Sequence, residues 1–147
     1  MLLSLMICLC LACTTRGEAS APCPVIEMSA VGASPPDTGK PVTLNDTTTI
    51  LISRTPLVAT GDITSASASE TGDQWAVNVT VTDDAAKRVH DFTQQHVGTH
   101  LALVVDGKAQ GTPRIASAVV GNRYRIDGLN RADAERLATA ISNGCRR

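Results

Sequence analysis

The sequence predicts an α+β domain, in which a mostly antiparallel sheet carries two helices packed on one face. Three observations indicate this class. Apolar residues alternate with polar ones over 75–81, as in a strand with one buried face. Mostly apolar residues recur at helical spacing over 85–96 and again over 134–141, which is typical of two amphipathic helices. The dipeptide Asp106-Gly107 between apolar residues is typical of a two-residue hairpin turn.

The first half of the domain is predicted to hold short strands and one helix. Apolar runs between turn-forming residues predict strands at 25–31, 50–53, 63–69 and 75–81. The segment 32–41 holds three prolines and two glycines and is predicted to be a loop. A helix follows, which starts at Asp83 and Asp84 with Thr82 or Asp83 as its N-cap and ends before Gly98. Its apolar face is expected to hold Ala85, Val89, Phe92 and His96.

The second half is predicted to contain a hairpin, two more strands and a closing helix. Strands are expected at 101–105, 115–119 and 123–127, the first of them leading into the hairpin turn. Asn130 with Asp133 resembles a capping box at the start of the last helix, which ends at Gly144. The apolar stripe of that helix is expected at Ala134, Leu137, Ala138 and Ile141.

Composition indicates one globular domain and argues against nucleic-acid binding. The chain has 147 residues, 43% of them hydrophobic, and we assign residues 23–147 to the domain. From Arg114 onward seven arginines stand against three acidic residues. A solvated face explains this excess, and attraction to anionic lipid or an acidic partner is the alternative. One Trp, one Tyr and one Phe leave few rings for stacking on single-stranded nucleic acid, so no nucleic-acid partner is expected.

The N-terminal residues 1–12 form an apolar run that is too short to span a membrane and is typical of an export signal peptide. The end of this run resembles that of a lipoprotein signal, so we expect Cys13 to be lipidated and the protein to be tethered to a membrane in the periplasm. A secreted form cut after Ala21 and an uncleaved anchor are the alternatives. The small polar residues 13–22 are expected to form a flexible tether.

Two cysteines, Cys23 and Cys145, lie at the two ends of the predicted domain. In an oxidising periplasm we expect them to form a disulfide bond, provided that their Cα atoms lie within about 7 Å. Two unrelated buried thiols are the alternative.

The sequence contains no recognisable catalytic motif. It has no G-x-S-x-G, no P-loop and no glycine-rich dinucleotide fingerprint, so we expect neither an enzyme nor a cofactor. His90, His96 and His100 would suggest a metal site if they shared one helical face, but Gly98 breaks that face. Solvent-exposed or helix-end histidines are therefore expected instead of metal ligands.

The last third of the chain contains an ordered set of motifs: a helix that ends in FT and is followed by VG, a strand that leads into DGK, a Pro-containing turn, a strand between two glycines, and a closing helix. The residues of this set are Phe92, Thr93, Val97, Gly98, Leu101, Ala102, Val104, Asp106, Gly107, Lys108, Pro113, Ile115, Gly121, Ile126, Gly128, Ala134, Leu137, Ala138 and Gly144. In this order they resemble the head subdomain of the first periplasmic loop of SecD, a membrane partner of the bacterial protein-export channel. The resemblance extends more loosely upstream to residue 50.

The resemblance implies a module that binds extended or unfolded polypeptide, without the membrane helices that supply the energy in SecD. Binding would occur in a groove between sheet and helices or at an exposed sheet edge. We place Leu103, Val105 and Ile115 in this groove, with plain core positions as the alternative for each. A structural adaptor that docks on one envelope or export protein is the alternative function.

Overall fold

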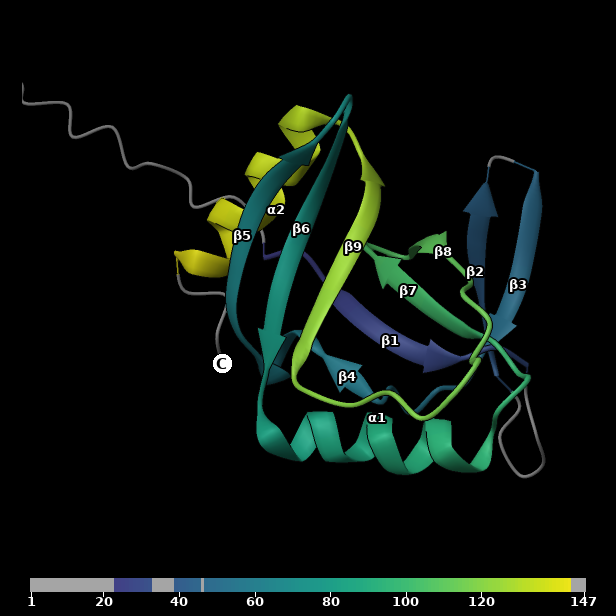
Figure 1. Ribbon diagram of the computed structural model, residues 1–147. Coiled ribbons are helices and arrows are strands. Elements are labelled where there is room, and N and C mark those ends of the chain that lie inside the picture. The colour runs from purple at the N-terminus through teal and green to yellow at the C-terminus, as the bar shows by residue number, and fades with distance from the viewer. Residues whose placement is uncertain (1–22, 33–38, 46, 144–147) are drawn as a thin grey trace, which may run out of the picture.

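The computed structural model describes residues 23–32, 39–45 and 47–143. Within these residues the strands form two sheets, shown in Figure 1. Along the chain the elements are β1 (Ile26–Ala30), β2 (Lys40–Asn45), β3 (Thr48–Ile52), β4 (Val58–Ala59), the 3-10 helix η1 (Thr60–Asp62), β5 (Ile63–Thr71), β6 (Gln74–Val81), α1 (Asp83–Gln95), β7 (Leu101–Val105), β8 (Lys108–Gly111), β9 (Arg123–Leu129) and α2 (Arg131–Ser142).

The six-stranded sheet has the order β3-β2-β8-β7-β1-β4, and all its pairs are antiparallel except β2 with β8. This sheet is strongly curved, so that the end of β1 approaches β3. The amide of Gly32 donates to the Leu51 carbonyl at 2.8 Å, and the amide of Ser53 donates to the Ala30 carbonyl at 2.9 Å. These bonds join the end of β1 to β3, so β1, β7, β8, β2 and β3 form a closed ring. Their shared buried cluster contains Val42, Ile52, Ala102, Val104 and Ala109.

The three-stranded sheet has the order β5-β6-β9 and is antiparallel throughout. Helix α2 contacts β5 and β6, and Figure 1 shows it beside them. The expected apolar stripe of α2 is confirmed, because all four of its residues are buried: Ala134, Leu137, Ala138 and Ile141. The cap is confirmed as well, since the Asn130 side chain accepts a hydrogen bond from the Asp133 amide at 2.9 Å. The main core therefore lies where this sheet, the helices and β1 meet.

Helix α1 runs next to β4 at the bottom of Figure 1. Thr82 is its N-cap, and the Thr82 hydroxyl accepts from the Ala85 amide at 3.3 Å. Arg88 links the helix to η1, because its guanidinium lies 2.7 Å from the Asp62 carboxylate. The expected helix face is corrected at its far end. Thr93 is buried there, whereas His96 is the exposed C-cap residue and its ring stacks on Phe92.

The α+β class and the antiparallel pairing are confirmed, but the expected single sheet is two sheets. The strand predicted at 115–119 is wrong, and its absence explains the division. Two side chains of α1 occupy the backbone groups of Val119, the last residue of this segment. The Val119 amide donates to the Thr93 hydroxyl at 2.9 Å, and His90 Nδ1 lies 3.0 Å from the Val119 carbonyl oxygen. The start of the segment bonds to the loop before β7, where the Ile115 amide donates to the Thr99 carbonyl at 2.8 Å, and its end is bound to a helix, so it does not link β8 to β9.

The loop predicted over 32–41 is corrected at its end, because β2 begins at Lys40 and continues to Asn45. Pro41 does not prevent this strand. On the side of β8, strand β2 pairs at Thr43 with Lys108. Pro41 lies outside this pairing, so the missing amide hydrogen of proline breaks no hydrogen bond to β8. Pairing with β3 and burial of Val42 stabilise a segment whose local sequence is typical of a loop.

Buried polar groups lie on one side of β1. Glu27 is 7% exposed, and its carboxylate oxygens lie 2.6 and 2.7 Å from the Lys40 ammonium of β2. The nearby Ser29 hydroxyl is buried and has no hydrogen-bond partner among the described residues. A paired charge is therefore part of the packing between β1 and the β2–β3 hairpin.

Candidate functional site

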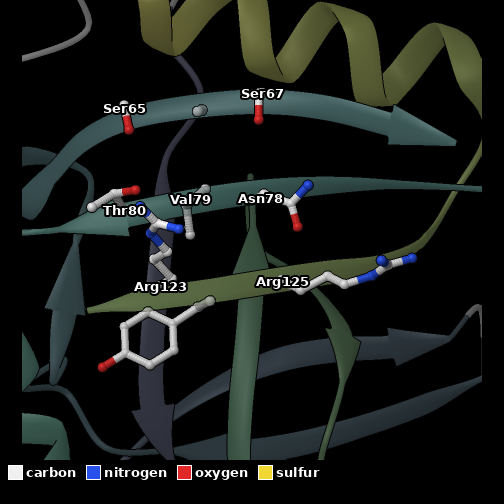
Figure 2. A pocket seen from close by; sticks show the side chains of 9 residues that line it. Ser65, Ser67, Asn78, Val79, Thr80, Arg123 and Arg125 are labelled. Carbon is white, nitrogen blue, oxygen red and sulfur yellow. The ribbon is translucent and has the colours of Figure 1, made fainter. Parts of the chain in front are cut away.

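One face of the three-stranded sheet carries polar side chains over a shallow hollow of about 490 Å³. Figure 2 shows them on three neighbouring strands. Two cross-strand rows make up this face, and we call their six residues the polar sheet face. They are Ser65, Thr80 and Arg123 in the first row and Ser67, Asn78 and Arg125 in the second.

Strand alternation produces this face. Residues between the polar positions point to the opposite side of the sheet, where Val77, Val79 and Ile126 are buried in the main core. Serine and alanine alternate along β5, so its side chains are short. Short side chains on β5 leave the hollow open to solvent beside the longer arginines of β9.

Several polar groups on this face have no partner among the residues that the structure describes. Arg125 is engaged, because its guanidinium lies 2.5 Å from the Asp127 carboxylate and 3.2 Å from the Thr71 hydroxyl. Asn78 donates to the Ser69 hydroxyl at 2.9 Å. The remaining side chains make no ion pair or side-chain hydrogen bond within the described part of the chain: Ser65, Ser67, Thr80 and Arg123.

Tyr124 separates the two arginines on β9. Its hydroxyl donates to the Gly121 carbonyl at 3.2 Å, and burial raises the pKa of the phenol above its ordinary value. The phenol therefore stays neutral at physiological pH. The positive charge at this end of the face belongs to the arginines.

A second hollow of about 350 Å³ lies between β5 and α2. Strand β5 pairs with β6 alone within the described residues, so its other edge faces this hollow. Part of that edge is capped, because the Ser142 hydroxyl donates to the Ala66 carbonyl at 3.3 Å. The hollow is lined by Ala68, Glu135, Ala138, Thr139, Ser142 and Asn143.

The expected groove residues lie apart from the polar sheet face. Val105 is 8% exposed and Ile115 is 4% exposed, so both contribute mainly to packing, and Leu103 is half-buried against the main core. Val105 also borders a hollow of about 450 Å³ between the β7–β8 turn and α2. A binding role for these three residues stays a prediction. The polar sheet face was not predicted from the sequence. The only indication of it there is the alternation along 123–127, which places Arg123 and Arg125 on one face of a strand.

The remaining sequence expectations have different outcomes. Asp106 and Gly107 connect β7 to β8 with φ values of 50° and 80°, as a turn of mirror-image type requires. The Asp106 carboxylate also accepts from the Val25 amide at 2.8 Å, which ties the turn to the start of β1. Cys13 and Cys145 lie outside the described residues. Pairing of Cys145 with Cys23 stays a prediction, which a shift in gel mobility on reduction would test.

The three histidines do not converge. His90 bonds to the Val119 carbonyl, His96 Nδ1 lies 2.8 Å from the Phe92 carbonyl oxygen, and His100 forms a β-bridge with Arg114. Among the described residues, no cluster of three or more His, Cys, Asp or Glu side chains could hold a metal ion. Neither helix of the described part has the length and apolar character needed to cross a membrane.

Solved structures of SecDF share this fold. A SecDF described as a membrane component that enhances protein export superposes with a TM-score of 0.63 at 23% identity, over 82% of this chain and 62% of that chain. SecDF in a super-membrane-facing form gives a TM-score of 0.64 at 24% identity, over 82% of this chain and 19% of that chain. At these identities the likeness concerns the fold alone.

Sequence comparison gives the family. The SecD subunit of Acidaminococcus fermentans is 35% identical over 80 residues, which are 54% of this chain and 19% of that protein. The SecDF of Thermus thermophilus is 33% identical over 69 residues, 46% of this chain and 9% of that protein. The chain thus spans less than a fifth of these relatives. Residues 37–145 match the model of the SecDF P1 head subdomain, and the chain therefore belongs to the SecDF P1 head subdomain family.

Proposed function

We propose that this chain is a non-catalytic module of protein export that binds extended or unfolded polypeptide on its polar sheet face. Membership of the SecDF P1 head subdomain family supports the relation to protein export. The binding proposal depends on three hydroxyl groups beside an open hollow that have no hydrogen-bond partner among the described residues, those of Ser65, Ser67 and Thr80.

Hydroxyl groups suit the recognition of a polypeptide whose sequence varies. Each can donate one hydrogen bond and accept others, and every non-proline residue of a bound segment offers one backbone donor and one acceptor. Contacts of this kind do not depend on the side chains of the segment. The hollow of about 490 Å³ also falls within the range of about 300–1,000 Å³ that is usual for ligand sites.

The sheet edges give a second means of holding an extended segment. Within the described residues, β5 and β9 each pair with β6 alone. An added strand would satisfy their outer backbone groups through main-chain hydrogen bonds, which again require no particular sequence. Part of the β5 edge is already occupied by Ser142 of α2, so the β9 edge suits an added strand better.

Site-specific photocrosslinking in intact cells tests this function. A photoreactive amino acid at Thr80 lies within the hollow, and the matched control is the same amino acid at Lys87, on the exposed side of α1. We expect the Thr80 probe to crosslink many different newly made exported proteins and the Lys87 probe to crosslink few. The measurement is mass spectrometry of the crosslinked products.

The outcomes separate the two functions that the sequence left open. Many unrelated chains attached to the Thr80 probe alone would support polypeptide binding. A single stoichiometric partner would refute it and favour the adaptor. Equal labelling from both positions would mean that the hollow contributes nothing to binding.

We further propose that the protein is exported and held at a membrane through a lipid on Cys13. The apolar run of residues 1–12 and the cysteine that follows it support this. Replacing Cys13 with serine should move the protein from the membrane fraction to the soluble fraction, because a serine hydroxyl is not a substrate for thioether formation. Fractionation and immunoblotting measure the change. Retention of the variant in the membrane fraction would refute the lipid anchor.

A further inference from the structure

We infer that the polar sheet face selects polypeptide segments that carry an acidic residue, and that Arg123 binds the carboxylate of that residue. This inference rests on the proposed function and adds a chemical preference to it. The observation that carries it is an arginine that has no acidic partner among the described residues, in a hollow otherwise lined by neutral side chains and by a second, neutralised arginine.

The surroundings of Arg123 suit a carboxylate. Its row across the sheet contains the hydroxyls of Thr80 and Ser65. In Figure 2 the Arg123 guanidinium extends from β9 toward β6, where Thr80 lies. A guanidinium can donate two parallel hydrogen bonds to one carboxylate, and a hydroxyl can donate a third. None of the described residues that line the hollow is acidic.

Arg125 differs from Arg123 although it lies on the same face. Asp127 neutralises it at 2.5 Å, and the Thr71 hydroxyl takes a further donor. The two arginines are two residues apart on β9, which corresponds to about 7 Å along a strand. Alternate side chains of an extended peptide have the same spacing. Within the described part of the chain, the face therefore offers one unpaired cation opposite one peptide position and a neutral ion pair opposite the next.

This charge pattern favours a peptide over a membrane surface. Attraction to anionic lipid usually needs clusters of about four to eight Lys or Arg residues. The hollow contains two arginines, one of them paired, so its net charge is small. One guanidinium that has no acidic partner in the described part of the chain, set among hydroxyls, fits a single carboxylate on an extended chain.

Fluorescence anisotropy with paired peptides tests the inference. The probes are fluorescein-labelled peptides of about ten residues that alternate Thr and Val, one with a central Asp and one with Asn at the same position. The full-length chain is compared with its Arg123→Gln variant. The matched control is Arg114→Gln, because Arg114 is exposed and lies outside the hollow.

We expect the full-length chain to bind the Asp peptide about three- to ten-fold more tightly than the Asn peptide, the range for one charge-assisted contact at an exposed site. Arg123→Gln should abolish this preference and leave binding of the Asn peptide unchanged. Arg114→Gln should preserve it. The preference should also decrease as salt is added, because exposed charges are screened.

A second variant gives a gain that misfolding would not produce. Asp127→Asn removes the carboxylate that neutralises Arg125 and leaves its guanidinium with only the Thr71 hydroxyl as a partner within the described residues. A peptide with Asp at alternate positions should then bind at least about three-fold more tightly to Asp127→Asn than to the unaltered chain.

The outcomes distinguish the inference from the function on which it rests. Equal binding of the Asp and Asn peptides would overturn the acidic preference and leave polypeptide binding intact. Binding of neither peptide would overturn both. Arg123-dependent binding to vesicles of anionic phospholipid, without peptide binding, would overturn the inference in favour of a membrane contact.

Discussion

Replacing Lys40 with methionine is expected to lower the free energy of unfolding by about 2 to 4 kcal/mol. The substitution keeps most of the side-chain volume but leaves the Glu27 carboxylate without its cation, and the Glu27 side chain is only 9% exposed. Breaking a fully buried ion pair costs about 3 to 5 kcal/mol, and the 35% exposure of Lys40 reduces that cost. Urea unfolding at neutral pH followed by circular dichroism measures the change.

Lys87→Met is the matched control for this prediction. Lys87 pairs with Asp91 at 2.5 Å on the surface of α1, where the two side chains are 71% and 47% exposed. Exposed pairs of this spacing contribute about 0.3 to 0.5 kcal/mol, so the control should remain close to the unaltered chain. Equal destabilisation by the two variants would show that burial of Glu27 does not set the cost.

Thr93→Val is expected to destabilise the fold by about 1 to 3 kcal/mol, although the two side chains have nearly the same shape. The Thr93 side chain is fully buried, donates to the Val89 carbonyl at 2.8 Å and accepts from the Val119 amide at 2.9 Å. Valine can do neither, so the Val119 amide would lose its partner. Urea unfolding measures the global effect, and hydrogen exchange at the Val119 amide measures the local one.

Thr99→Val is the control, because the Thr99 hydroxyl makes one exposed hydrogen bond, 2.8 Å from the His96 carbonyl oxygen. Water can replace that bond, so little change is expected. Faster exchange at Val119 in Thr93→Val alone would support the role of Thr93 in holding the segment that leads into β9. Unchanged exchange there would contradict it.

The location of the proposed binding surface could not be predicted from the sequence. The resemblance to the SecD head suggested a groove at Leu103, Val105 and Ile115, and in the structure Val105 and Ile115 are buried. The polar sheet face joins residues from Ser65 to Arg125 through the register of three strands. Neither arginine is distinguishable from a solvated charge until its neighbours across the sheet are known.

The sequence by itself determined the elements whose signals are local. Alternation placed β6, helical spacing and caps placed α1 and α2, and Asp106-Gly107 placed the β7–β8 turn, because each signal lies within one element or turn. Only the tertiary structure decided the conformation of the apolar segment 115–119 and of the Pro-containing strand β2. The former binds Thr93 and His90 of a helix, and the latter pairs with strands distant in sequence. Long-range contacts provide the hydrogen-bond partners of these segments, and a local pattern carries no information about such partners.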